Sequence, residues 1–228
     1  MVEMGLKVLV CDLDPQSNLT IGLGVDPTTL LDRNMKELLA NSKTRAEDFL
    51  LQTAEGIDLF PSGIELSRLE AAAQEVAREK MLAKKLQPLL SNYDFILCDT
   101  PPSLGHPTLN AMAAADYILI PVEPQPFCIY GLSQLQETFE MIREDSNLRL
   151  AILGLFIAKL DKRISLQNEI AERVKNEWGD LAFQTIIYSR AKIQETQLEG
   201  RSIITSDKNS PTAKEYRALT KEVLHRAK

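Results

Sequence analysis

The sequence predicts an α/β protein built on a doubly wound, mostly parallel sheet flanked by helices. Short apolar runs that are typical of strands alternate along the chain with longer segments whose apolar residues recur at helical spacing. Most of the short runs are apolar throughout instead of alternating with polar residues, which is typical of parallel strands covered on both faces. Strands and helices that alternate in this way are joined by right-handed crossovers.

Six runs bounded by turn residues are predicted to be strands. They cover residues 7–11, 57–60, 95–98, 117–121, 151–158 and 184–188. Residues 65–90 carry leucine, alanine and valine at three- and four-residue spacing, which predicts an amphipathic helix. The same spacing predicts further helices over residues 132–142, 166–178 and 212–226.

Length and composition favour a single domain over residues 1–228. The chain has 228 residues, of which 44% are apolar, and no repeat or linker divides it. The formal net charge of −6 argues against a globally basic nucleic-acid-binding protein but is compatible with a local basic patch. No apolar run approaches the roughly 20 residues that span a bilayer. Because residues 1–7 also lack the pattern of a secretory signal, we expect a cytoplasmic protein with no membrane role.

The cysteines and histidines argue against several kinds of site. Cys11, Cys98 and Cys128 include no close-spaced pair, so we expect small buried side chains in a reducing compartment. The two histidines, His106 and His225, lie in no nucleophile or zinc motif. Their positions argue against a catalytic triad or a zinc centre.

Carboxylates follow two of the predicted strands. The stretch KVLVCDLDPQSN, residues 7–18, ends its strand on Asp12 and Asp14. The stretch YDFILCDTPPS, residues 93–103, ends its strand on Asp99, which Thr100 follows. In open α/β sheets, ligands bind beyond the carboxyl ends of the strands. A single aspartate of this kind is more often a helix cap or part of a turn, but two acidic strand ends favour a shared metal and phosphate site.

Three longer stretches together resemble the ParA/Soj family of partitioning ATPases, which belongs to a larger group with deviant P-loops that also includes MinD. They are KVLVCDLDPQSNLTIGLG, YDFILCDTPPSLGHPTLNAMAAADYILIPVEPQPFCIYGLSQL and TIIYSRAKIQETQLEGRSII, and the likeness covers essentially all 228 residues. The resemblance implies a P-loop NTPase-like fold, ATP and magnesium as cofactors, and a homodimer bridged by ATP. It also implies non-specific DNA and a ParB-like protein as partners, and a nucleoid-associated location.

The resemblance assigns roles by position. Asp14 matches the aspartate that orients the attacking water, with Asp12 beside it in a supporting role. Asp99 matches the aspartate that holds magnesium through water, and Thr100 follows it in the same motif. Lys159 falls where the family usually places a residue beside the adenine, although a lysine is unusual there.

One part of the family pattern is absent from the sequence. The family begins with a strand and a K-G-G-x-G-K-T loop, whose backbone N–H groups and lysines hold the phosphates. Here residues 1–6 look like the last turn of the helix after that loop, closed by Gly5 as its C-cap. The chain is then a fragment, or a shortened paralogue that no longer hydrolyses ATP and serves as an interaction module. The retained acids favour the fragment, and either way we expect this chain to bind ATP weakly or not at all.

The same gap has a structural consequence. In the family, the missing strand lies between the strands that correspond here to residues 95–98 and 117–121. We expect these two strands to pair directly, to accept another segment between them, or to leave open edges that destabilise the domain.

Basic residues in the last part of the chain have two interpretations. Lys214, Arg217 and Lys221 recur at helical spacing, and the ordinary explanation is a solvated helix face. The alternative is a patch that follows DNA phosphates without reading sequence. Its candidate residues are Arg190, Lys192, Arg201, Lys214, Arg217 and Lys221. The resemblance implies that Lys192 stands where ParA relatives carry an arginine implicated in contacting DNA.

A third hypothesis is an ATP-dependent ligase on the same fold, such as the cobyrinic acid amidases. The likeness to ParA continues through the last third of the chain, which counts against this hypothesis.

Overall fold

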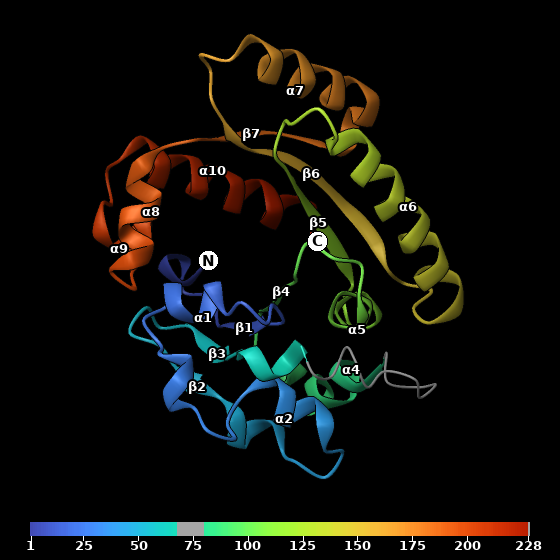
Figure 1. Ribbon diagram of the computed structural model, residues 1–228, viewed down its shortest axis with the longest axis vertical. Coiled ribbons are helices and arrows are strands. Elements are labelled where there is room, and N and C mark those ends of the chain that lie inside the picture. The colour runs from blue at the N-terminus through green and yellow to red at the C-terminus, as the bar shows by residue number, and fades with distance from the viewer. Residues whose placement is uncertain (68–79, 228) are drawn as a thin grey trace. The chain divides into compact units, whose positions relative to one another are not determined.

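The computed structural model describes residues 1–67 and 80–227, and the chain divides into two compact units (Figure 1). Unit 1 comprises Met1–Ala115 and Thr196–Ser202, and unit 2 comprises Asp116–Glu195 and Ile203–Lys228. Each unit has its own sheet and its own buried core. A single domain over residues 1–228 remains a prediction.

Unit 1 contains a four-stranded sheet in the order β2-β3-β1-β4. The central β1 (Val8–Asp12) pairs in parallel with β3 (Asp58–Phe60) and with β4 (Phe95–Asp99). The two-residue β2 (Leu51–Gln52) runs antiparallel to β3. Every residue of β1 is buried, as expected for an apolar parallel strand in the middle of a sheet.

Short helices surround the sheet of unit 1. The α-helices are α1 (Asn18–Gly22), α2 (Met35–Ala40), α4 (Met81–Leu86) and α5 (His106–Ala114). Single 3-10 segments lie at Val2–Met4, Pro27–Thr29, Ala46–Phe49, Ile64–Leu66 and Gln87–Asn92. The main core joins Leu9 of β1 to Leu38 of α2 and Leu82 of α4. The first 3-10 turn is closed by Gly5, whose φ of 81° gives the left-handed C-cap that the sequence predicts.

Unit 2 contains a three-stranded parallel sheet in the order β5-β6-β7. Its strands are β5 (Tyr117–Val122), β6 (Ala151–Leu160) and β7 (Ala182–Tyr188). Its helices are α6 (Cys128–Asp145), α7 (Ser165–Trp178), α9 (Ile203–Ser206) and α10 (Pro211–Arg226), with a 3-10 turn at Gly179–Leu181. Helix α8 (Ala191–Leu198) begins in unit 2 and ends in unit 1. Helices α6 and α7 share a core with the sheet of unit 2, and α10 packs along β7 (Figure 1).

Carboxylates of α10 close the outer edge of β7. Glu222 accepts hydrogen bonds from the N–H groups of Gln184 at 2.7 Å and Thr185 at 3.0 Å. Glu215 accepts one from the N–H of Tyr188 at 3.3 Å. These bonds occupy N–H groups that would otherwise be free to pair with another strand.

The strands β4 and β5 belong to different sheets. Within the described residues, β4 pairs only with β1, and β5 pairs only with β6. The direct pairing that the sequence offers as one outcome for these two strands stays a prediction.

The structure confirms the predicted fold class of parallel strands flanked by helices. All six predicted strands are present, with ends that move by at most two residues. The continuous helix predicted over residues 65–90 is wrong at both ends, which form the 3-10 segments Ile64–Leu66 and Gln87–Asn92. The second segment has a proline in its first turn. Residues 68–79 of that prediction lie outside the described chain. No helix in the described part of the chain is both long and apolar enough to cross a membrane.

Candidate functional site

The carboxyl ends of β1 and β4 bring the predicted acids together. The two strands pair in register, so that Asp12 lies opposite Asp99. One residue further on, the N–H of Leu13 donates to the carbonyl oxygen of Asp99 at 2.8 Å. Asp14 follows in the next turn, so the three acids lie at one end of the sheet of unit 1.

Asp12 is fully buried, and both oxygens of its carboxylate accept hydrogen bonds. Oδ1 accepts from the N–H of Asp14 at 3.1 Å. Oδ2 accepts from the N–H of Thr20 at 2.9 Å and from the hydroxyl of Thr20 at 2.6 Å. Burial raises the pKa of Asp12, and the hydrogen bonds from Thr20 oppose this rise. An inward-facing carboxylate of this kind suits a supporting role.

Asp14 lies half-buried in a tight turn after β1. Its Oδ1 accepts from the N–H of Gln16 at 2.9 Å, and its carbonyl oxygen accepts from the N–H of Ser17 at 2.9 Å. Ser17 is buried and has a φ of 57°, a left-handed conformation that residues other than glycine seldom adopt. Strained backbone of this kind is concentrated at functional sites.

The protonation of Asp99 depends on the other two acids. Partial desolvation of the carboxylate, followed by the negative charges of Asp12 and Asp14, raises the pKa of Asp99 from 3.8 to about 6, although the residue keeps an exposed surface. Thr100 begins the loop that leads from β4 towards α5. Carboxylate oxygens are the ligands that magnesium prefers. Among the described residues, no three His, Cys, Asp or Glu side chains form a metal site by themselves, so a cation here would need water or phosphate oxygens as further ligands.

Lys159 lies in unit 2, near the end of β6. Its φ of 55° is unusual for a lysine, and it falls where the pairing of β6 with β7 shifts register. Its ammonium forms an ion pair with the carboxylate of Glu123, the residue after β5. Its predicted place beside an adenine remains a prediction.

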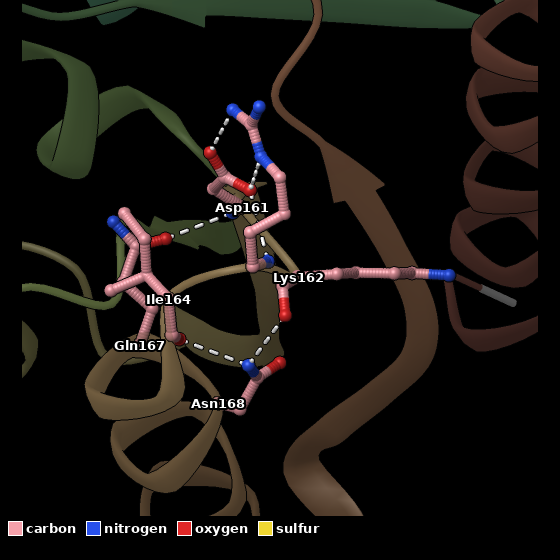
Figure 2. Close-up of polar contacts among 6 residues, drawn as sticks. Asp161, Lys162, Ile164, Gln167 and Asn168 are labelled. Atoms are coloured by element: carbon pink, nitrogen blue, oxygen red, sulfur yellow. Dashed lines mark hydrogen bonds and ion pairs between the residues drawn. The ribbon is translucent and has the colours of Figure 1, made fainter.

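Side-chain hydrogen bonds fix the loop from β6 into α7 (Figure 2). Gln167 accepts from the N–H of Asp161 at 2.8 Å, and Asn168 donates to the carbonyl oxygen of Lys162 at 3.0 Å. The side chain of Lys162 extends away from these bonds, and its ammonium lies 3.9 Å from the centre of the Tyr188 ring. The ends of β6 and β7 are therefore linked by a cation–π contact.

Three of the predicted DNA-contacting residues are engaged within the protein. The guanidinium of Arg190 forms two hydrogen bonds of 2.7 Å with the carboxylate of Glu215. Lys192 forms an ion pair of 3.0 Å with Glu195. Arg217 donates to a backbone carbonyl in the loop before α10. A cation that is already bound to a carboxylate is less available to bind a DNA phosphate.

The other three predicted residues are exposed. Lys214 and Lys221 lie on one face of α10 with Ala218 and His225, and Arg201 lies in the Thr196–Ser202 segment of unit 1. In the described part of the chain, neither lysine has an ion pair. Lys214 and Lys221 thus lie on one exposed face of α10, whereas the guanidinium of Arg190 is bound to Glu215.

Sequence reasoning missed Thr20 and Ser62. The N–H of Ser62 donates to the hydroxyl oxygen of Thr20 at 3.0 Å. The hydroxyl of Ser62 is itself buried and has no hydrogen-bond partner among the described residues. Nothing in the sequence distinguishes these two residues, because only the fold brings them next to Asp12.

Comparisons with known proteins assign the family. Residues 1–152 match the family described as an AAA domain. Soj, the sporulation initiation inhibitor protein of Bacillus subtilis strain 168, is 34% identical over 221 residues, which cover 96% of this chain and 87% of Soj. The chain belongs to the ParA/Soj family. An uncharacterized protein of Mycobacterium tuberculosis is 38% identical over 226 residues, which cover 98% of this chain and 71% of that relative.

Solved structures extend the likeness beyond the ParA/Soj family. Cobyrinic acid a,c-diamide synthase from Mycobacterium smegmatis matches with a TM-score of 0.84 and 28% identity, over 100% of this chain and 85% of the synthase. The same synthase with a bound ATP analog and magnesium matches with a TM-score of 0.76 and 29% identity, over 87% of this chain and 81% of the synthase. This chain and the synthase therefore share one fold.

Proposed function

We propose that this ParA/Soj family chain takes part in ATP-dependent segregation of DNA or positioning of another cargo. In this proposal ATP bridges two copies, the dimer binds DNA without sequence preference at the nucleoid, and a ParB-like partner stimulates hydrolysis. The observation that carries the proposal is the in-register pairing of β1 with β4, which places three acids at one end of a parallel sheet. Ligands of α/β sheets bind at that end.

Each acid has its own task in the proposed site. Asp14 accepts a hydrogen bond from the attacking water and orients it towards the terminal phosphate. Asp99 is ionised above about pH 6 and would hold magnesium through a water, with Thr100 beside it. Bound magnesium would neutralise charge on the phosphate oxygens. Asp12 stays buried and holds the turn that carries Asp14.

The phosphate cradle is the part of this site that the 228 residues do not supply. They include no glycine-rich loop with a lysine, and such loops provide most of the donors that hold phosphates. We therefore expect the 228-residue chain, used alone, to bind ATP weakly and not to hydrolyse it. Titration calorimetry with ATP and magnesium measures this, and micromolar affinity or clear turnover would contradict the expectation.

An ATPase assay on the chain extended at its N-terminus by a strand and a K-G-G-x-G-K-T loop tests the proposed site. We expect the extended protein to hydrolyse ATP and Asp14→Asn to lower kcat by about 100-fold or more. Asp32→Asn is a matched control, because Asp32 is an exposed aspartate in the loop before α2. Equal turnover by wild type and Asp14→Asn would remove Asp14 from the reaction.

Assays of DNA binding and of ATP turnover on the same extended protein distinguish two other functions. If the extended protein binds DNA equally well with and without ATP and hydrolyses none, the chain is a non-catalytic interaction module. The likeness to the solved synthase favours a ligase as the second candidate. Turnover that depends on cobyrinic acid, and not on duplex DNA, would support the ligase.

A further inference from the structure

Thr20 lies where three segments of unit 1 meet. It belongs to α1, its side chain bonds Asp12 at the end of β1, and it is bonded by Ser62 just after β3. The adjoining Pro61 accepts from the N–H of Met35, the first residue of α2, at 2.8 Å. We call Asp12, Thr20 and Ser62 the Thr20 network.

The hydroxyl proton of Thr20 has one available acceptor, which is the carboxylate of Asp12. The oxygen accepts from the N–H of Ser62 at 3.0 Å, so its own proton is directed to Oδ2 of Asp12 at 2.6 Å. The N–H of Thr20 donates to the same carboxylate oxygen at 2.9 Å. All three residues are buried, and charge-assisted hydrogen bonds shielded from water are strong and directional.

The other carboxylate oxygen of Asp12 connects the Thr20 network to the turn at Asp14. Oδ1 of Asp12 accepts from the N–H of Asp14 and so fixes the plane of the Leu13–Asp14 peptide. The turn then closes through the bond from the N–H of Ser17 to the carbonyl oxygen of Asp14. The left-handed φ of Ser17 needs such surrounding bonds to persist.

We propose that Thr20 is a positioning residue for Asp14. Through Asp12, its hydroxyl holds the turn from Asp14 to Ser17 in the conformation that sets where the Asp14 carboxylate lies. What Asp14 does chemically rests on the proposed function, whereas the positioning itself does not.

The local geometry of Thr20 distinguishes positioning from an ordinary helical role. A threonine inside a helix commonly bonds the carbonyl oxygen four residues earlier. The hydroxyl of Thr20 instead bonds a carboxylate outside its own helix. Helix α1 has only five residues, so its placement depends on contacts of this kind.

Amide hydrogen exchange, measured by NMR on the 228-residue chain without nucleotide, tests the proposal. Thr20→Val keeps the shape of the side chain and removes the hydroxyl. We expect the amides of Asp14 and Ser17 to exchange about 10-fold faster or more, because a hydrogen bond to a charged group is lost. The amide of Val10, in the middle of β1, should keep its wild-type exchange rate. If Thr20 only stabilised the fold in general, the exchange of Val10 would become faster as well.

Two matched variants sharpen the test. Thr20→Ser restores a hydroxyl and should return the Asp14 and Ser17 amides to wild-type rates. Ser62→Ala removes a hydroxyl that belongs to the same network but has no hydrogen-bond partner among the described residues. This variant should therefore leave the exchange rates of the Asp14 and Ser17 amides unchanged. Wild-type rates in Thr20→Val, or acceleration that Thr20→Ser does not reverse, would overturn the proposal.

The wild-type chain offers a measurement that does not depend on a variant folding. The proposal requires the hydroxyl proton of Thr20 to be protected from exchange with water and therefore visible by NMR. A hydroxyl proton that exchanges as fast as that of threonine in an unfolded peptide would also overturn it. Since neither measurement involves ATP, failure of the ATPase assay would leave this result intact, and the reverse also holds.

Discussion

Lys214 and Lys221 differ from Arg190 in what their charges already contact. The two lysines project into solvent from one face of α10. The guanidinium of Arg190 is bound to Glu215 and lies 5.6 Å from the centre of the Tyr188 ring. Non-specific DNA binding draws its free energy from solvated cations that replace the counterions of the phosphates. At the scale of single residues, the lysines are therefore the better candidates for DNA contact.

Lys221→Ala should weaken binding of the P-loop-extended protein to any duplex DNA. The slope of log affinity against log salt concentration should fall by about 1, as expected for one phosphate contact. Lys84→Ala, which removes an exposed lysine from α4, is the control. Mobility shifts over a range of salt concentrations measure both quantities. If Lys221→Ala and Lys84→Ala behave alike, Lys221 belongs to an ordinary solvated face.

Asp99→Asn should stabilise the chain at neutral pH and not at low pH. The pKa of Asp99 is raised in the folded state from 3.8 to about 6, so between these values the folded state binds more protons than the unfolded state. The free energy of unfolding of the wild type therefore falls as pH rises through this window. The gain from Asp99→Asn should be full above about pH 6 and lost below about pH 4. Urea unfolding across this range measures it, and a gain independent of pH, or one matched by Asp32→Asn, would contradict the assignment.

At the scale of elements, the strands were predictable because burial on both faces demands unbroken apolar runs. β1 shows this, since all five of its residues are buried. β2 was missed because it has two residues, neither of them fully buried. Helices α1 and α2 have five and six residues, too few turns for a helical period to show.

The close approach of β6 and the end of α10 was also beyond sequence reasoning. Arg226 lies 4.0 Å from the centre of the Phe183 ring and donates to the carbonyl oxygen of Ala182 at 3.0 Å. Gly154 makes room for this arrangement, because a Cβ there would lie 2.3 Å from the carbonyl oxygen of Leu181 and 2.8 Å from the guanidinium. Its φ of 145° is also unfavourable for any residue with a side chain.

Gly154→Ala should therefore lower the free energy of unfolding of unit 2 by about 2 kcal/mol or more. Gly131→Ala is the matched control, since Gly131 lies inside α6 with no atom near its missing Cβ. That control should raise the free energy of unfolding by roughly 0.5–1 kcal/mol, because alanine is the better helix former. Thermal and urea unfolding of both variants measure the contrast. Similar changes in the two glycine variants would refute the close-packing argument.

At the scale of the whole molecule, the sequence predicted which acids lie at one end of the sheet better than which residues form hydrogen bonds with them. Asp12, Asp14 and Asp99 follow from one rule, because the carboxyl ends of neighbouring parallel strands meet at one end of a sheet. Thr20 and Ser62 follow from no such rule, since residues 42 positions apart meet only after the sheet has formed. The pairing of Arg190 with Glu215 is of the same kind, and it changed which basic residues carry the DNA proposal.

The sheet edges lead to a last prediction, about association of the 228-residue chain. Carboxylates of α10 occupy N–H groups of β7, whereas β4 and β5 each stand at the edge of the sheet of their own unit. Leu97 of β4 and Tyr117 of β5 remain 41% and 42% exposed. Apolar strands with free N–H and C=O groups pair readily with other chains. We therefore expect this chain to self-associate at micromolar concentration, as measured by sedimentation velocity.

A charge on the edge strand should reduce this association. Leu97→Lys places a lysine on β4, a residue that natural edge strands use to prevent pairing. Leu198→Lys is the control, because Leu198 is 90% exposed at the end of α8 and belongs to no strand. If association arises from strand pairing, Leu97→Lys suppresses it and Leu198→Lys does not. Equal suppression by the two variants would instead attribute association to exposed leucines in general, and a monomeric wild type would show that the edges of β4 and β5 do not recruit another chain.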